Sequence, residues 1–104
     1  MARFDVYVNP DAAGRTLIPY LLDVQNDHVR GLQTRVMVPL WHASMVPTPV
    51  TDLNPSLEIA DQRLIMDTAA LGAVPLKYLK DIAGNLATHQ LSIQNALDVL
   101  FGSY

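Results

Sequence analysis

The stretch Arg3-Phe4-Asp5-Val6-Tyr7-Val8 places apolar side chains at positions 4, 6 and 8 and alternates them with Arg3, Asp5 and Tyr7. A period of two puts alternate side chains on opposite faces of a β-strand. Asn9-Pro10 follows directly and ends the expected strand. Residues 3–8 therefore predict a strand in a sheet with one buried face, and the segments that follow can be compared with this strand.

Several later segments also have strand character. A second strand is expected over residues 16–24, with an edge position or a bulge at Pro19. A short strand over residues 36–38 is expected to stop at Pro39. Residues 57–59 and 63–66 flank a short loop and predict a β-hairpin. The proline-containing stretch 43–56 is expected to be an irregular connection that can include a short strand near Val50.

Two helices are expected after these strands. Pro75 suits the first turn of a short helix from Leu76 to Ala83, with Gly84 as its C-terminal stop. A longer helix is expected from an N-cap at Thr88 through Phe101, with Gly102 at its end. The chain is therefore predicted to be mainly β with a C-terminal α-helix, in a single domain over residues 1–104.

Composition excludes several classes of protein. The chain has no cysteine, which excludes a disulfide framework, a thiol nucleophile and a Cys-ligated metal. No secretory signal follows Met1 and no apolar run approaches the roughly 18–20 residues of a membrane span, so a cytoplasmic protein is expected. The net charge is −3 and the seven basic residues are dispersed along the chain. Direct nucleic-acid binding is therefore not expected.

The sequence contains no recognisable catalytic motif. His28, His42 and His89 do not have the spacing of metal ligands, so neither a metal site nor a cofactor is expected. Asp23 and Asp27 are interpreted as strand-end and turn carboxylates rather than as an acid–base pair. With no catalytic residue identified, we expect a protein that acts by binding another macromolecule and not an enzyme.

Two features leave alternatives open. Trp41, the only tryptophan, is either a core or rim residue or an aromatic anchor for a partner. Asp98 carries the only charge between Asn85 and Tyr104. The terminal helix is thus either a core-packed helix with a neutral polar face or one whose second face or tail contacts a partner, and both can hold.

The order and spacing of the short motifs, together with the chain length, resemble the CcdB family of bacterial toxins along nearly the whole chain. The motifs are Phe4-x-Val6-Tyr7, Leu22-Asp23-Val24-Gln25-Asn26-Asp27, Arg35-Val36-Met37-Val38-Pro39-Leu40, Leu53-Asn54-Pro55, Arg63-Leu64-Ile65-Met66-Asp67-Thr68, Val74-Pro75 and Ile93-Gln94-Asn95-Ala96-Leu97-Asp98-Val99-Leu100-Phe101.

The resemblance implies the small SH3-like β-barrel shared with the Kid and MazF toxins, with a terminal helix attached, and a homodimer. It also implies the toxin component of a type II toxin–antitoxin system, which binds the DNA gyrase A subunit and traps the gyrase–DNA cleavage complex. A CcdA-like antitoxin would neutralise it through a flexible C-terminal tail. No cofactor or catalytic group would be involved.

The resemblance further implies a gyrase contact at the end of the terminal helix and just beyond it. The matching positions are Asp98, Leu100, Phe101, Gly102, Ser103 and Tyr104. The loop after the Asp-Val-Gln motif also contributes, which adds His28 and Val29.

This chain departs from the family pattern at that contact. The well-known toxins end in Phe-Trp-Gly-Ile, whereas this chain ends in Phe101-Gly102-Ser103-Tyr104. Asp98 stands where they carry Asn, and His28 replaces an apolar residue. Two alternatives follow: a non-toxic or retargeted homologue that keeps the dimer and the antitoxin but not gyrase poisoning, and a MazF-type endoribonuclease, which the acidic composition disfavours.

Overall fold

Strand β3 is the centre of the molecule, because the strands on both of its sides pair with it. The computed structural model describes residues 1–102 of the 104-residue chain. Over these residues, the chain forms β1 (Asp5–Val8), β2 (Tyr20–Asp23), β3 (Thr34–His42), β4 (Ser56–Ile59), β5 (Gln62–Met66), β6 (Gly72–Pro75), β7 (Ile82–Asn85) and α1 (Gln90–Phe101). Short 3-10 turns lie at Ala12–Thr16, Ala43–Met45, Thr68–Ala70, Leu76–Tyr78 and Ala87–His89.

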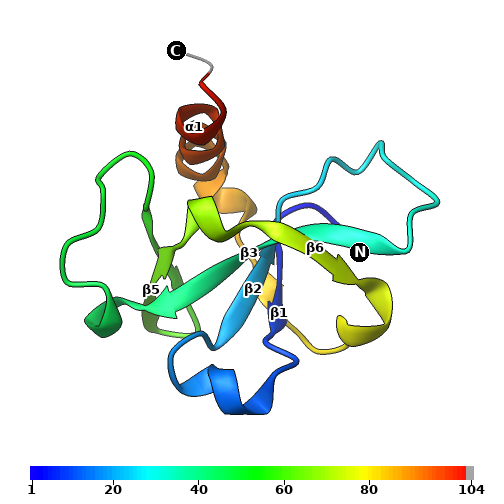
Figure 1. The fold of residues 1–104 in the computed structure, drawn as a ribbon, viewed down its shortest axis with the longest axis horizontal. Coiled ribbons are helices and arrows are strands. Elements are labelled where there is room, and N and C mark those ends of the chain that lie inside the picture. The colour runs from blue at the N-terminus through cyan, green and yellow to red at the C-terminus, as the bar shows by residue number, and fades with distance from the viewer. Residues whose placement is uncertain (103–104) are drawn as a thin grey trace.

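All strand pairs are antiparallel. The sheet runs in the order β4-β5-β3-β2-β1-β7, and β6 pairs with β3 beside this path. The sheet curls into a half-barrel, and α1 lies against it (Figure 1). The predicted class, mainly β with a C-terminal helix, is confirmed.

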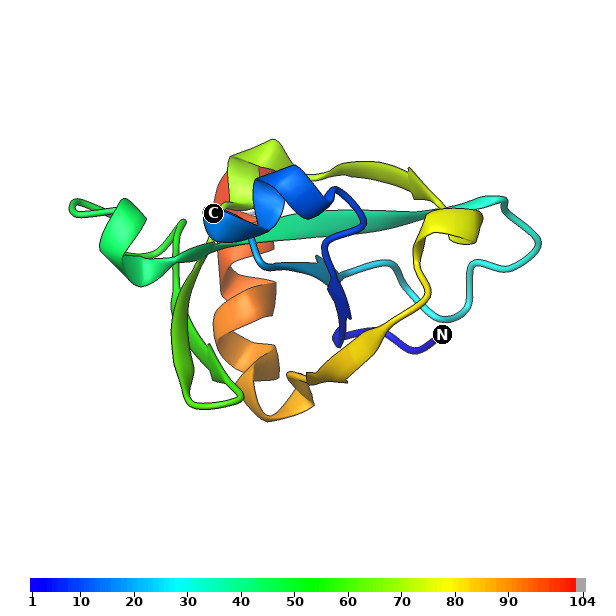
Figure 2. The ribbon, with the colours of Figure 1, turned by 90° about the horizontal axis from the view of Figure 1, so that it is seen from below.

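The main core fills the space between the inner face of the sheet and α1 (Figure 2). Alternating strand positions supply one side of it, as the sequence pattern requires. Its buried members are Phe4, Val6, Leu22, Val24, Val38, Leu40, Leu57, Leu64, Met66, Leu86, Ile93, Ala96 and Leu97. A smaller cluster on the other face of the sheet joins Tyr7, Met37 and Leu79.

The predicted stop at Pro39 is wrong, because β3 continues through it to His42. β3 pairs with β6 over residues 34–37 and with β5 over residues 40–42, so Pro39 lies where the strand changes partner. The Pro39 carbonyl accepts the Asp67 N–H at 3.0 Å. In a β-strand, the N–H and the carbonyl of one residue point to the same side. The N–H that Pro39 lacks would therefore point to the place between β6 and β5, so its absence removes no hydrogen bond of the sheet.

The predicted helix from Leu76 to Ala83 is also wrong. Only the turn Leu76–Tyr78 is helical, and β7 follows it. Gly84 is therefore not a helix stop but a position inside β7. A Cβ on Gly84 would lie 2.7 Å from Ile59 Cδ1, so the residue is small because Ile59 packs against its backbone.

The remaining boundaries differ less. The hairpin is confirmed, with Ala60 and Asp61 at φ values of 51° and 61° in a two-residue turn. β2 is shorter than predicted, since the turn Ala12–Thr16 precedes it. α1 begins after the turn Ala87–His89, and Thr88 does not cap it. The stretch 43–55 is irregular apart from the turn Ala43–Met45, as predicted, but no strand forms near Val50 and β4 already begins at Ser56. No helix within residues 1–102 is long and apolar enough to cross a membrane.

Candidate functional site

The two flanks of α1 differ sharply in exposure. Ile93, Ala96 and Leu97 are buried in the main core, whereas Leu91 is 86% and Phe101 69% exposed. The predicted core-packed helix is thus confirmed, and it also presents apolar side chains outward. An exposed aromatic ring at the end of an anchored helix is the type of group that dominates protein interfaces.

Gly102 ends α1 as predicted. Its φ of 76° is left-handed, and its N–H donates to the Asp98 carbonyl, which is a glycine C-cap. The side chains of Asp98 and Leu100 are half-buried, and Gln94 Nε2 donates to Asp98 Oδ1 at 3.2 Å. The predicted site residues Ser103 and Tyr104 lie outside the described residues.

His28 and Val29 lie in the loop between β2 and β3, residues 24–33, referred to below as the 24–33 loop. Both are exposed. Asn26 shapes the turn that carries them: its side-chain oxygen accepts the His28 N–H at 2.9 Å, and its carbonyl accepts the Val29 N–H at 3.0 Å. Val29 also lines a cavity of about 490 Å³ at this end of the molecule, together with Leu32.

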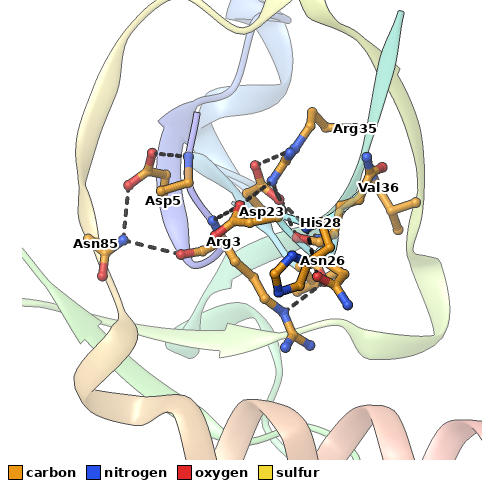
Figure 3. A network of polar contacts seen from close by, with 12 residues as sticks. Arg3, Asp5, Asp23, Asn26, His28, Arg35, Val36 and Asn85 are labelled. Carbon is orange, nitrogen blue, oxygen red and sulfur yellow. Dashed lines mark hydrogen bonds and ion pairs between the residues drawn. The ribbon is translucent and has the colours of Figure 1, made fainter. Parts of the chain in front are cut away.

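An ion-pair network anchors the base of this loop (Figure 3). Arg35 donates to Asp23 through Nε at 2.8 Å and Nη2 at 2.9 Å, and Nη2 also reaches Asp27 Oδ1 at 3.3 Å. Asp23 is fully buried and Arg35 nearly so. A bidentate guanidinium–carboxylate pair satisfies both buried groups. Asp23 and Asp27 are thus the strand-end and loop carboxylates that the sequence predicted.

The environments of the two carboxylates move their pKa values in opposite directions. Burial raises the pKa of Asp23, although hydrogen bonds and charge from Arg35 act against the increase. Desolvation also acts to raise the pKa of Asp27, but the Arg3 N–H and the Arg35 guanidinium outweigh it and lower that pKa. Both carboxylates accept hydrogen bonds from the groups that hold the base of the loop.

Trp41 is half-buried on the outer face of β3. Its Nε1–H donates to Asp67 Oδ2 at 3.0 Å, which satisfies the polar atom of the ring. The indole lines an apolar cavity of about 270 Å³ with Met45 and Ile65. Trp41 is therefore at the rim and not in the core, while its role as an aromatic anchor for a partner stays a prediction.

The structure does not bring the two predicted contact segments together. The 24–33 loop lies at one end of the molecule, and the C-terminal end of α1 lies away from it in both views (Figures 1 and 2). Residues 1–102 contain no group of three or more His, Cys, Asp or Glu side chains placed to hold a metal ion.

A family model described as CcdB protein matches residues 3–102. The chain belongs to the CcdB family. The curled antiparallel sheet with its terminal helix is consistent with the CcdB fold. Membership implies a toxin of a toxin–antitoxin pair whose target is gyrase, and toxins of this family are gyrase poisons rather than enzymes. Dimer formation also follows from the family.

Sequence reasoning missed Arg3, Arg35 and Gln94, which connect the segments of this site. Arg35 offered a signal, because an arginine directly before the apolar segment Val36-Met37-Val38 would have to be paired once buried. Its partner Asp23 lies 12 positions earlier. In the β2–β3 register Asp23 faces Met37, which makes Arg35, two residues before Met37, its diagonal neighbour on the same face. Arg3 and Gln94 offered no comparable signal.

Proposed function

We propose that this chain is the toxin of a type II toxin–antitoxin pair and acts without enzymatic chemistry, in the cytoplasm. It binds the gyrase A subunit and traps gyrase with its DNA cleaved. It works as a homodimer and is neutralised by the C-terminal tail of a CcdA-like antitoxin. The observation that supports this best is Phe101, which is 69% exposed at the C-terminal end of a helix that is anchored in the core through Ile93 and Ala96.

The target surface comprises the exposed flank of α1 and the residues at its end. Leu91 and Phe101 supply apolar area, and Asp98 is the only charge on the helix. His28 and Val29 form a second, separate part of the surface. An apolar patch around one charge suits a protein partner better than nucleic acid, whose phosphates require clustered cations.

One feature supports the alternative of a retargeted or non-toxic homologue. Gly102 places no side chain directly after Phe101, where the well-known toxins carry Trp. Loss of a large aromatic anchor typically weakens an interface by about 2 kcal/mol or more. A homologue of this kind would keep the dimer and the antitoxin while losing or changing the target.

The test is the binding of the purified protein to the purified gyrase A subunit. We expect Phe101→Ala to weaken binding roughly thirtyfold, the equivalent of about 2 kcal/mol. The matched control is Val50→Ala, because Val50 is 60% exposed but lies in the 43–55 connection. A Tyr104→Ala variant tests the tail in the same assay.

A second measurement separates binding from poisoning. Wild-type protein added to gyrase and plasmid DNA should increase the amount of cleaved DNA, and Phe101→Ala should not. If the wild type neither binds the A subunit nor increases cleavage, the gyrase proposal is wrong and the retargeted homologue replaces it.

A further inference from the structure

Arg3 connects segments that are far apart in the sequence. Its backbone N–H donates to Asp27 Oδ1 at 2.9 Å, and its Nε donates to the Val24 carbonyl at 3.1 Å. The other end of the guanidinium reaches α1, where Nη2 donates to Gln94 Oε1 at 2.9 Å. Figure 3 shows Arg3 beside Asp23 and the turn that carries His28, with its side chain extending toward the helix.

Gln94 extends this connection toward the end of α1. Its amide oxygen accepts from Arg3, and its amide nitrogen donates to Asp98, one helical turn later. A guanidinium can only donate and a carboxylate can only accept, so a glutamine between them satisfies both in a single orientation. A continuous series of polar contacts therefore runs from Asp27 through Arg3 and Gln94 to Asp98.

The backbone around Phe4 fixes the direction of Arg3. Phe4 has a φ of 73°, a left-handed conformation that is unfavourable in a residue other than glycine. Its N–H donates to the Asp23 carbonyl at 2.7 Å and its ring is buried. The Arg3 guanidinium carbon lies 4.8 Å from the centre of that ring, a cation–π distance.

From these contacts we infer that Arg3 is a positioning residue for the target surface. It holds the base of the 24–33 loop and the Asp98 side of α1 in one fixed arrangement. This inference rests on the proposed function, because two separated contact segments can engage one rigid target only if their relative position is fixed.

Arg3 is half-buried and lies outside both apolar clusters. The turn at Asn26 and the backbone bonds of α1 do not depend on its side chain. An exchange of the side chain should therefore leave the fold intact while the loop and the helix lose their connection. Such a result separates positioning from a role in stability alone.

The decisive experiment compares Arg3→Met with wild type in binding to the gyrase A subunit. Methionine keeps an unbranched apolar chain but no donors. We expect affinity to fall roughly tenfold, with the fold and the dimer retained and the denaturant midpoint lowered only by the loss of the two side-chain hydrogen bonds of Arg3. Gln94→Ala should give the same loss, and the double variant should bind no more weakly than either single variant.

Two further variants sharpen this result. Arg3→Lys keeps the charge, but a lysine ammonium cannot donate to Val24 and Gln94 at the same time as the planar guanidinium does. Its affinity for the A subunit should therefore lie between those of Arg3→Met and wild type. Arg63→Met is the matched control, since Arg63 lies in the β4–β5 hairpin and donates to Ser56. It should bind the A subunit like wild type.

A distance measurement tests the positioning without the target. The chain has no cysteine, so spin labels can be attached at Val29→Cys and Leu91→Cys, in dimers formed with excess unlabelled chain. The label-to-label distance distribution should be narrow with Arg3 present, broad with Arg3→Met and narrow with Arg63→Met. If wild type does not bind gyrase, the function fails while this measurement still decides the role of Arg3. Equal widths, or unchanged affinity despite a broader distribution, would overturn the inference.

Discussion

Helix α1 and the 24–33 loop are held to the same sheet by different forces. The helix is anchored by Ile93, Ala96 and Leu97 in the apolar core. The loop begins at Val24 in the same core, but its base is otherwise anchored by Asp23, Arg35 and other polar groups through directed hydrogen bonds. Apolar burial depends on area and on few solution conditions, whereas ion pairs depend on partners and pH. The part of the proposed target surface on α1 should therefore be insensitive to pH, whereas the part on the 24–33 loop should depend on pH.

The largest expected effect comes from removing one partner of the buried ion pair. Arg35→Ala leaves the fully buried Asp23 carboxylate without its partner, and an uncompensated buried charge typically costs about 4 kcal/mol. Urea unfolding at neutral pH measures the loss.

The control for this prediction removes both charges. The double variant Asp23→Leu with Arg35→Met should recover most of the lost stability, because no unpaired charge remains in the site. A loss below about 1 kcal/mol for Arg35→Ala would mean that the loop is not held by this pair and that the contrast with α1 is false.

A smaller loss is expected on the apolar side. Ile93→Ala removes a side chain that is wholly inaccessible to solvent, and such truncations typically cost about 3 kcal/mol through lost burial and the cavity left behind. Urea unfolding at pH 7 and pH 4 should give the same loss, because Ile93 has no titratable contact. A loss that varies strongly with pH would show that the packing of the helix depends on charge after all.

The ion-pair network at the base of the 24–33 loop should make the stability of the folded state depend on pH. The lowered pKa of Asp27 stabilises the folded state above the ordinary value of 3.8, and this contribution is lost as the pH falls through the folded-state value. Asp23 has the opposite sign, since its raised pKa favours the protonated folded form. Asp27→Asn should therefore differ most from wild type at neutral pH and approach it below 3.8.

The same unfolding series on Asp52→Asn provides the control, because Asp52 is exposed and has no ion pair among residues 1–102. A constant gap between wild type and Asp27→Asn across the acid range would contradict the assigned role of Asp27.

The smallest stability effect is expected on the exposed flank of α1. Leu91→Ser changes a side chain that is 86% exposed, and such changes typically alter stability by less than about 0.5 kcal/mol. Affinity for the gyrase A subunit should nevertheless decrease. A large drop in the unfolding midpoint would mean that Leu91 is covered by a partner chain, and the mass of the variant by light scattering would then identify the dimer contact.

Local patterns predicted the elements that local physics determines. The period-two alternation identified β1, two strand-like segments around a short loop identified the β4–β5 hairpin, and the apolar stripe ending at Gly102 identified α1. Pro39 misled the prediction because its tolerance depends on a partner change between β6 and β5, which only the register reveals. Gly84 was wrongly predicted to end a helix, because the side chain that packs against its backbone belongs to Ile59, a residue 25 positions away.

The candidate site was predictable only through the family resemblance. The resemblance identified the exposed Phe101 and the loop residues His28 and Val29. It did not identify Arg3 and Gln94, which lie 91 positions apart and meet only in the folded chain. Long-range polar contacts produce no periodic pattern in a sequence. The two segments of the proposed target surface could therefore be predicted, but the hydrogen bonds that connect them could not.

The pairing of β1 with β7 has a consequence for protein synthesis. Asp5 pairs with Asn85, so β1 cannot complete its place in the sheet until the segment around residue 85 has also left the ribosome. α1 follows β7 and carries the proposed target surface. The order of translation therefore delays the assembly of that surface until residues 82–101 have been made, and a product that stops before them cannot present it.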